Sequence, residues 1–279
     1  MNKNKFPVFA FFISFFLLSC QEKKVNSTAN EAQGLAENKY HIDGVESVQH
    51  TEGNSHRQVP LDKGALDSIV KAVLNSAYGA ANFDSSRGCW RHSFQAGGDS
   101  MDYCMVAATP YVINSGDGAR IYLQTHSDPQ AGIYSQVDPG LEGLFFIGLG
   151  ANQKWTALAS SPAIDMGQAG DCGCSDSKVI DVGPNIHGWL STVGGVWQGV
   201  QVTRYSLQVP MGGKIRDVSE IPRVSENSPD ESNALEVDRD GKVVAGMYPI
   251  KVTQTRAGNV LGTRLVSYDE RKGVYPWDP

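Results

Sequence analysis

The chain has 279 residues, with 30 Asp and Glu against 24 Lys and Arg, and a formal net charge of −6 at pH 7. Proteins that bind nucleic acid or anionic membrane surfaces in general carry a basic patch or stripe, so the charge argues against both classes. About 220 residues follow residue 58, and a chain of that size can bury ~70% of its unfolded surface and form one sizeable core or two small ones.

The first residues of the chain have the order of an export signal. Lys3 and Lys5 precede an apolar run from Phe6 to Leu18, and the small residue Ser19 comes directly before Cys20. The run has about 13 residues, whereas a membrane-spanning helix needs ~20. Residues 1–19 are therefore predicted to be a cleaved signal peptide, which leaves a mature chain without Lys3 and Lys5 and changes the net charge from −6 to −8.

Leu17, Leu18, Ser19 and Cys20 resemble the lipobox of bacterial lipoproteins. The resemblance implies that the chain is cut before Cys20 and that acyl chains such as palmitate, attached to this cysteine, hold the protein on a lipid bilayer. Gln21 is not the aspartate that favours inner-membrane retention in enterobacterial lipoproteins. The resemblance thus favours the outer membrane, with the head in the periplasm or at the cell surface. An ordinary signal peptide with a coincidental cysteine is the alternative.

The segment after Cys20 is polar and has no sustained hydrophobic period. It cannot bury enough apolar surface to offset the entropy of ordering, so residues 20–58 are predicted to be the lipidated cysteine and a flexible tether. His41, His50 and His56 lie in this tether and are expected to be solvated. Residues 59–279 are predicted to form one β-rich globular domain, and the polar stretch near 221–241 is interpreted as a long surface loop or a boundary between two lobes.

One helix is predicted at the start of this domain. Asp62 is a suitable N-cap and Gly79 can take the left-handed position at the end. Apolar residues recur between them at helical spacing, which predicts an amphipathic helix packed on a sheet. They are Leu61, Leu66, Ile69, Val70, Val73, Leu74 and Ala77.

The rest of the domain has the pattern of short strands cut by turn residues. The fold class is predicted to be mainly β with one N-terminal helix (α+β), with an antiparallel sandwich, meander or barrel-like sheet as the open alternatives, because no βαβ alternation appears. Asp240 and Gly241 are expected at the positive-φ positions of a hairpin turn. Strands are expected at 103–113, 119–126, 143–150, 154–160, 178–183, 188–197, 200–210, 214–221, 242–255 and 263–269.

Four cysteines remain after Cys20, and an even number in an exported protein suggests disulfides. A hairpin centred on Ala96, Gly97 and Gly98 places Cys89 opposite Cys104, and with them an aromatic pair and an opposite-charge pair. The pairs in this register are Trp90 with Tyr103 and Arg91 with Asp102. The register therefore predicts a disulfide between Cys89 and Cys104.

Cys172 and Cys174 form a Cys-x-Cys motif. A structural disulfide between them is the first interpretation, cross-pairing with the hairpin cysteines is the second, and metal or redox chemistry is the third. A single Cys-x-Cys lacks the second ligand pair that would indicate zinc, and the acidic neighbours Asp171 and Asp176 disfavour a reactive thiolate.

No catalytic motif, metal site or cofactor site is predicted. His92, His126 and His187 lie in separate segments, and no G-x-S-x-G, H-E-x-x-H, P-loop or G-x-G-x-x-G occurs. His187, Trp189 and Trp197 form a candidate ligand groove, with ordinary core packing as the alternative.

Two functional classes stay open from the sequence. In the first, the head is non-catalytic and binds another envelope protein or an incoming protein, as inhibitors, immunity proteins and assembly factors do. In the second, it is an envelope hydrolase or carbohydrate-active enzyme whose site has no local motif. A metal or redox lipoprotein that uses Cys172 and Cys174 is a weaker third.

Overall fold

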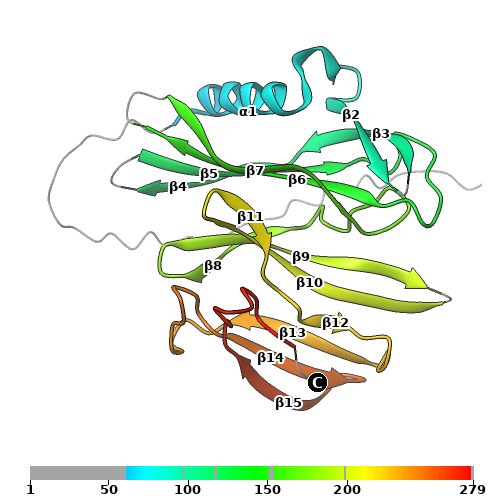
Figure 1. Cartoon of the computed structure of the whole chain (residues 1–279), viewed down its shortest axis with the longest axis vertical. Helices are drawn as coiled ribbons and strands as arrows, with labels where there is room; N and C mark the ends of the chain where they lie inside the picture. Colours follow the sequence, from blue (N-terminus) through cyan, green and yellow to red (C-terminus); the bar gives the residue numbers. More distant parts are fainter. Residues whose placement is uncertain (1–60, 97, 116–117, 151–153, 198, 278–279) are drawn as a thin grey trace, which may run out of the picture. The chain divides into compact units, whose positions relative to one another are not determined.

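The computed structural model describes residues 61–277 with the exception of 97, 116–117, 151–153 and 198 (Figure 1). The predicted signal peptide, Cys20 and the tether lie outside these residues. The described part is mainly β, with one α-helix and three sheets in which every pair of neighbouring strands is antiparallel. The predicted fold class is confirmed.

The helix α1 (Lys63–Tyr78) is capped as predicted at both ends. The Asp62 side chain accepts a hydrogen bond from the backbone N–H of Ala65 (2.8 Å), and Gly79 ends the helix at φ +90°. The apolar stripe packs on the first sheet, burying Ile69, Val73, Leu74 and Tyr78. No helix among the described residues is both long and apolar enough to cross a bilayer.

The first sheet has seven strands in the order β1-β2-β3-β5-β6-β7, with β4 paired to β5. A short 3₁₀-helix, η1 (Ala80–Asn82), leads into it from α1. Its strands are β1 (Phe83–Asp84), β2 (Cys89–Ala96), β3 (Asp99–Ala107), β4 (Tyr111–Ser115), β5 (Gly118–Ser127), β6 (Gly140–Leu149) and β7 (Trp155–Met166).

The middle sheet has the order β11-β10-β9-β8, with β12 paired to β10, and the C-terminal sheet has the order β13-β14-β15. The strands of the middle sheet are β8 (Lys178–Gly183), β9 (Ile186–Trp197), β10 (Val200–Met211), β11 (Lys214–Asp217) and β12 (Pro222–Val224). Those of the C-terminal sheet are β13 (Glu231–Val237), β14 (Ile250–Arg256) and β15 (Asn259–Val266).

The interpretation of 221–241 as a long loop is wrong, because β12 and β13 lie within it. β13 was not predicted because the segment is polar, and even one of its inward positions holds a polar residue, Asn233. The Asn233 amide nitrogen donates to the carbonyl oxygen of Pro222 in β12 (2.9 Å), at a position that a strand pattern expects to be apolar, while its Oδ1 has no hydrogen-bond partner among the described residues.

A turn is present at residues 239–240, where the Gly241 N–H donates to the Asp238 carbonyl oxygen (3.3 Å), but the positive φ predicted for Asp240 and Gly241 is wrong. Neither residue has a positive φ, and the left-handed conformations occur at Ala245 and Gly246. Val244 and Met247 exchange two backbone hydrogen bonds of 2.9 Å around those two residues, so the strand expected from 242 begins only at Ile250.

Cys89 is bonded to Cys104 as predicted, but the register that led to this prediction is wrong. Ala96 pairs with Asp99, which places Cys89 opposite Val106. The centre of the hairpin therefore lies one residue later in the chain than the predicted register requires. The disulfide joins diagonal neighbours with Cα atoms 5.5 Å apart, within the range for such bonds.

The other two cross-strand pairs of that register are absent. Trp90 pairs with Met105, and Arg91 pairs with Cys104. The Arg91 guanidinium instead binds the Asp84 carboxylate at 2.8 Å.

Three apolar clusters fill the described part. The first joins α1 to the first sheet, and the second joins the middle sheet to the C-terminal sheet. The third, between the first and middle sheets, has a small core of Tyr122, Leu144 and Trp189. Polar side chains occupy much of the remaining contact between these two sheets, and this polar layer contains the candidate site.

Candidate functional site

The polar layer between the first and middle sheets contains a carboxyl group with no solvent exposure. Glu142 on β6 is 0% exposed, and the Gln124 amide on β5 donates to its Oε1 at 2.7 Å. The same amide nitrogen donates to the carbonyl oxygen of Cys174 at 2.9 Å. Burial raises the pKa of Glu142 from 4.5 to about 8, and the charge of Asp217 adds to this shift. Glu142 is thus mostly protonated at neutral pH.

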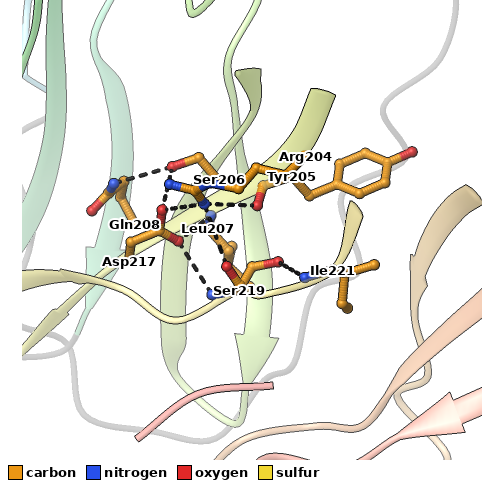
Figure 2. A network of polar contacts seen from close by, with 8 residues as sticks. All are labelled: Arg204, Tyr205, Ser206, Leu207, Gln208, Asp217, Ser219 and Ile221. Carbon is orange, nitrogen blue, oxygen red and sulfur yellow. Dashed lines mark hydrogen bonds and ion pairs between the residues drawn. The ribbon is translucent and has the colours of Figure 1, made fainter. Parts of the chain in front are cut away.

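The carboxylate of Asp217 on β11 differs from that of Glu142 because it has several hydrogen-bond partners (Figure 2). Its charge nevertheless acts on Glu142. Its carboxylate accepts hydrogen bonds from the Arg204 guanidinium (2.6 Å) and the Ser206 hydroxyl (3.0 Å). It also accepts from the backbone N–H groups of Leu207 (3.1 Å) and Ser219 (3.2 Å). Asp217 therefore joins β10 to β11 and the segment after it, while Oε2 of Glu142 has no hydrogen-bond partner among the described residues.

Cys172 and Cys174 form a disulfide at the border of this layer. Their Cα atoms are 5.1 Å apart, and both side chains are buried. The bond agrees with the first interpretation of the motif, and it positions the Cys174 carbonyl that Gln124 binds. Among the described residues, no group of three or more His, Cys, Asp or Glu side chains could hold a metal ion.

Of the three residues predicted to line a ligand groove, His187 and Trp189 lie beside the same residue, Tyr122. Trp189 on β9 is 2% exposed, and its ring lies 5.1 Å from the ring of Tyr122 on β5. The His187 ring is 5.8 Å from Tyr122, and its Nε2 binds Asp181 at 2.7 Å.

Trp197 does not join this group. It pairs with Val200 at the far end of β9, eight residues from Trp189, or about 26 Å along a strand. Its side chain lies outside the described part. Sequence reasoning missed Tyr122, since no local pattern shows that β5 and β9 face each other across two sheets.

The three histidines of the domain are on separate strands, as their sequence separation predicted. His92 is on β2 beside the Tyr78 ring (5.3 Å), and burial lowers its pKa. His126 is on β5 and His187 on β9. Within the described part, none of them makes a hydrogen bond to a serine hydroxyl or a thiol, so no nucleophile and base pair is formed there.

A second candidate site is the outer edge of β15. This strand ends the C-terminal sheet and pairs only with β14, so its other edge has no neighbouring strand among the described residues. Val260 is 65% exposed, Leu261 50% and Leu265 59%. Edge strands are usually protected by charged side chains, proline or a bulge. β15 has a bulge at Leu261 and one charged side chain, Arg264, which lies over the Trp277 ring (3.3 Å). Residues 262–266 keep a continuous register beyond it.

The face of β14 and β15 turned away from the apolar core combines hydroxyl and apolar side chains. Thr253 and Thr263 approach each other across the strands (3.3 Å), and Leu265 lies opposite Lys251. A cavity of about 360 Å³ on the other face is lined by Gly262, Arg264, Asn233 and Trp277, among others. A side chain at Gly262 would meet nothing within 4 Å, so the strand is open at this point.

Comparison of the chain with protein-family models, with curated proteins and with solved structures found no match in any of the three.

Proposed function

We propose that this chain is a lipid-anchored protein of the bacterial envelope whose β-rich head binds an extended segment of a partner protein along the edge of β15. The observation that carries the proposal is the edge itself, five residues in continuous register with exposed apolar side chains beside it. An added strand would pair with the backbone groups of residues 262–266, which is the mode of β-strand addition.

Backbone pairing and apolar burial together would supply enough free energy to bind such a segment. Each backbone hydrogen bond contributes ~0.5–1.5 kcal/mol net, and full burial of a leucine such as Leu265 contributes ~1.5–3 kcal/mol. The cavity beside Gly262 supports the proposal further, because main-chain pairing gives affinity while pockets for alternate side chains give specificity.

The predicted anchor at Cys20 and the tether to residue 58 support a binding role. A flexible chain of nearly forty residues has a mean reach of about 35 Å. It would keep the head near envelope targets and raise its effective concentration against them without any new contact.

The test uses the mature chain from residue 20 with Cys20→Ser, which removes the lipid, to capture partners from solubilised envelope by crosslinking. Leu265→Lys adds a charge to the β15 edge and should reduce capture at least tenfold, because an added strand would bury that charge. The matched control is Val196→Lys, an exposed apolar residue (52%) on β9 of the middle sheet, and it should leave capture unchanged.

Equal capture by both variants would contradict the assignment to β15. Turnover of peptidoglycan, ester or phosphoester substrates that is lost on changing His92, His126 or His187, with no retained protein, would contradict the binding role altogether. The anchor is tested separately, since labelling of the full chain with palmitate should be lost in Cys20→Ser.

A further inference from the structure

The cavity of about 360 Å³ beside the β15 edge lies where one position of the sheet has no side chain. Asn233, Gln254 and Gly262 are paired across β13, β14 and β15, so they stand in one row on the same face of the sheet. Gly262 ends the row and is exposed, and a Cβ atom added to it would meet nothing within 4 Å. The row therefore ends in an open space that a side chain from outside β15 can enter.

A strand added along β15 would place one of its residues opposite Gly262, as the fourth member of this row. Cross-strand neighbours have Cβ atoms ~4.5–5.5 Å apart, and aromatic or long side chains also reach the diagonal neighbours at ~7–8 Å. The side chain of that residue would therefore cross the glycine and enter the cavity. An aromatic ring suits this position, because aromatic side chains on a neighbouring strand cover the edge glycines of sheets and bury large apolar areas.

Among the described residues that line the cavity two are charged, and both have partners. Glu231 binds Arg256 and the Gln254 amide within its own sheet. Arg264 lies over the Trp277 ring at 3.3 Å. The wall thus carries one negative and one positive group whose charges balance, and it favours a neutral side chain.

The accessible part of the wall is both polar and apolar. Ser225, Ser228 and Gln254 are half-buried, so their hydroxyl and amide groups can meet an incoming side chain. Pro222 and Trp277, also half-buried, supply apolar surface. A side chain that fits both parts has an apolar ring and ends in a group that donates and accepts hydrogen bonds, which is the phenol of tyrosine.

We propose that the partner segment carries a tyrosine opposite Gly262 and that this side chain fills the cavity. The proposal rests on the strand addition proposed above, and it names the side chain by which the β15 edge distinguishes among extended segments. Backbone pairing along residues 262–266 is the same for every partner sequence, whereas the tyrosine would select among partners.

The experiment selects a display library of random nonapeptides on the mature Cys20→Ser chain and measures the affinities of the enriched peptides by calorimetry. These peptides should share one tyrosine at a fixed place. Replacing this tyrosine by alanine should weaken binding at least tenfold, because the ring and the hydroxyl are both lost. Replacing it by phenylalanine should weaken binding severalfold, because only the hydroxyl is lost.

Gly262→Leu places a side chain of the protein itself at the entrance of the cavity and should weaken binding of the tyrosine peptides at least tenfold. The glycine has no positive φ and its Cβ position is open, so the variant should fold, and Gly262→Ala should give a smaller loss of the same kind. The matched control is Ala234→Leu, which adds bulk to an exposed residue on the opposite face of β13 and should leave binding unchanged.

The possible outcomes separate this proposal from the proposed function. Peptides that lose binding in Leu265→Lys, but carry no common tyrosine or bind Gly262→Leu like the parent chain, would overturn the tyrosine proposal and leave the β15 edge in place. Peptides that bind Leu265→Lys like the parent chain would contradict the edge itself, and no enrichment of any peptide would overturn both.

Discussion

The two faces of the middle sheet are packed in different ways. Toward the C-terminal sheet, the contact is almost entirely apolar, and Leu207, Val209, Ile250 and Tyr275 are all 0% exposed. Toward the first sheet, a small apolar cluster around Trp189 is bordered by buried glutamine, serine and carboxyl side chains. The stability of the apolar contact should therefore be insensitive to pH near neutrality, whereas that of the polar layer should follow the protonation of Glu142.

This comparison also separates the two candidate sites. The β15 edge belongs to a sheet fixed by an apolar contact that does not titrate near neutral pH. The polar layer contains a titrating group, Glu142, which Gln124 binds. The packing of the polar layer should thus depend on pH through Glu142, while binding at the β15 edge should not.

The largest effect is expected for Ile250→Ala in the apolar contact. Truncation of a buried isoleucine should lower the free energy of unfolding by ~2–5 kcal/mol, through lost burial and the cavity that remains. Urea unfolding at pH 5 and pH 8 should give the same loss, since no group that titrates in this range lies in the cluster. Val196→Ala, at an exposed position, should cost less than ~0.5 kcal/mol. A loss that changes with pH would contradict the comparison.

Glu142→Gln should remove a pH dependence from the polar layer. In the folded protein the pKa of Glu142 is about 8 against an ordinary 4.5, so between these values the folded state holds a proton that the unfolded state has released. The stability from this group is complete below pH 4.5 and is lost as pH rises to about 8, by at most ~1.4 kcal/mol per pH unit. The variant should gain up to ~5 kcal/mol relative to wild type between pH 4.5 and 8.

Unfolding titrations across that range provide the measurement. If wild type and Glu142→Gln keep parallel curves, Glu142 is not the titrating group of this layer. Glu231→Gln, at a carboxylate that binds Arg256 and Gln254 in the C-terminal sheet, is the matched control and should not remove the slope.

Asp217→Asn sharpens the comparison within the polar layer. The asparagine cannot accept all four hydrogen bonds of the carboxylate, and the free energy of unfolding should fall by ~2 kcal/mol. Because the charge of Asp217 raises the pKa of Glu142, the variant should also move the Glu142 transition to lower pH. An unchanged transition would show that Asp217 does not act on Glu142, and Asp99→Asn at an exposed site should change neither quantity.

The smallest effect is expected for Cys172→Ala with Cys174→Ala. Counted with both cysteines, the loop of Cys172 and Cys174 has three residues and that of Cys89 and Cys104 has 16, for which the loop-closure relation gives ~1.6 and ~3 kcal/mol. The free energy of unfolding of this double variant and of Cys89→Ala with Cys104→Ala measures the difference. Equal losses would mean that contacts of the buried Cys172 and Cys174, such as the bond from Gln124 to the Cys174 carbonyl, outweigh loop closure.

Most of the elements could be predicted because their signals are local. Asp62 and Gly79 bound α1 through capping and a left-handed residue, and alternation with turn residues located most strands. The disulfide between Cys89 and Cys104 was predicted, but from the wrong register. The local sequence did not fix where the hairpin is centred, and the two cysteines are close enough to bond as diagonal neighbours as well as directly opposite each other. β13 was missed because a polar residue, Asn233, takes an inward position, where its amide nitrogen binds the Pro222 carbonyl of a segment eleven residues away.

The sequence by itself determined the fold class, the capped helix and the pattern that predicts an acylated Cys20, since each depends on residues close together in the chain. Only the tertiary structure decided which distant residues meet. It placed Glu142 beside Gln124 and Cys174, brought Tyr122 to Trp189, and left Trp197 at the far end of β9. It also left β15 at the edge of its sheet. The physical reason is that burial, pKa shifts and cavities come from the packing of separate sheets, and sheet packing has no local signal in the chain.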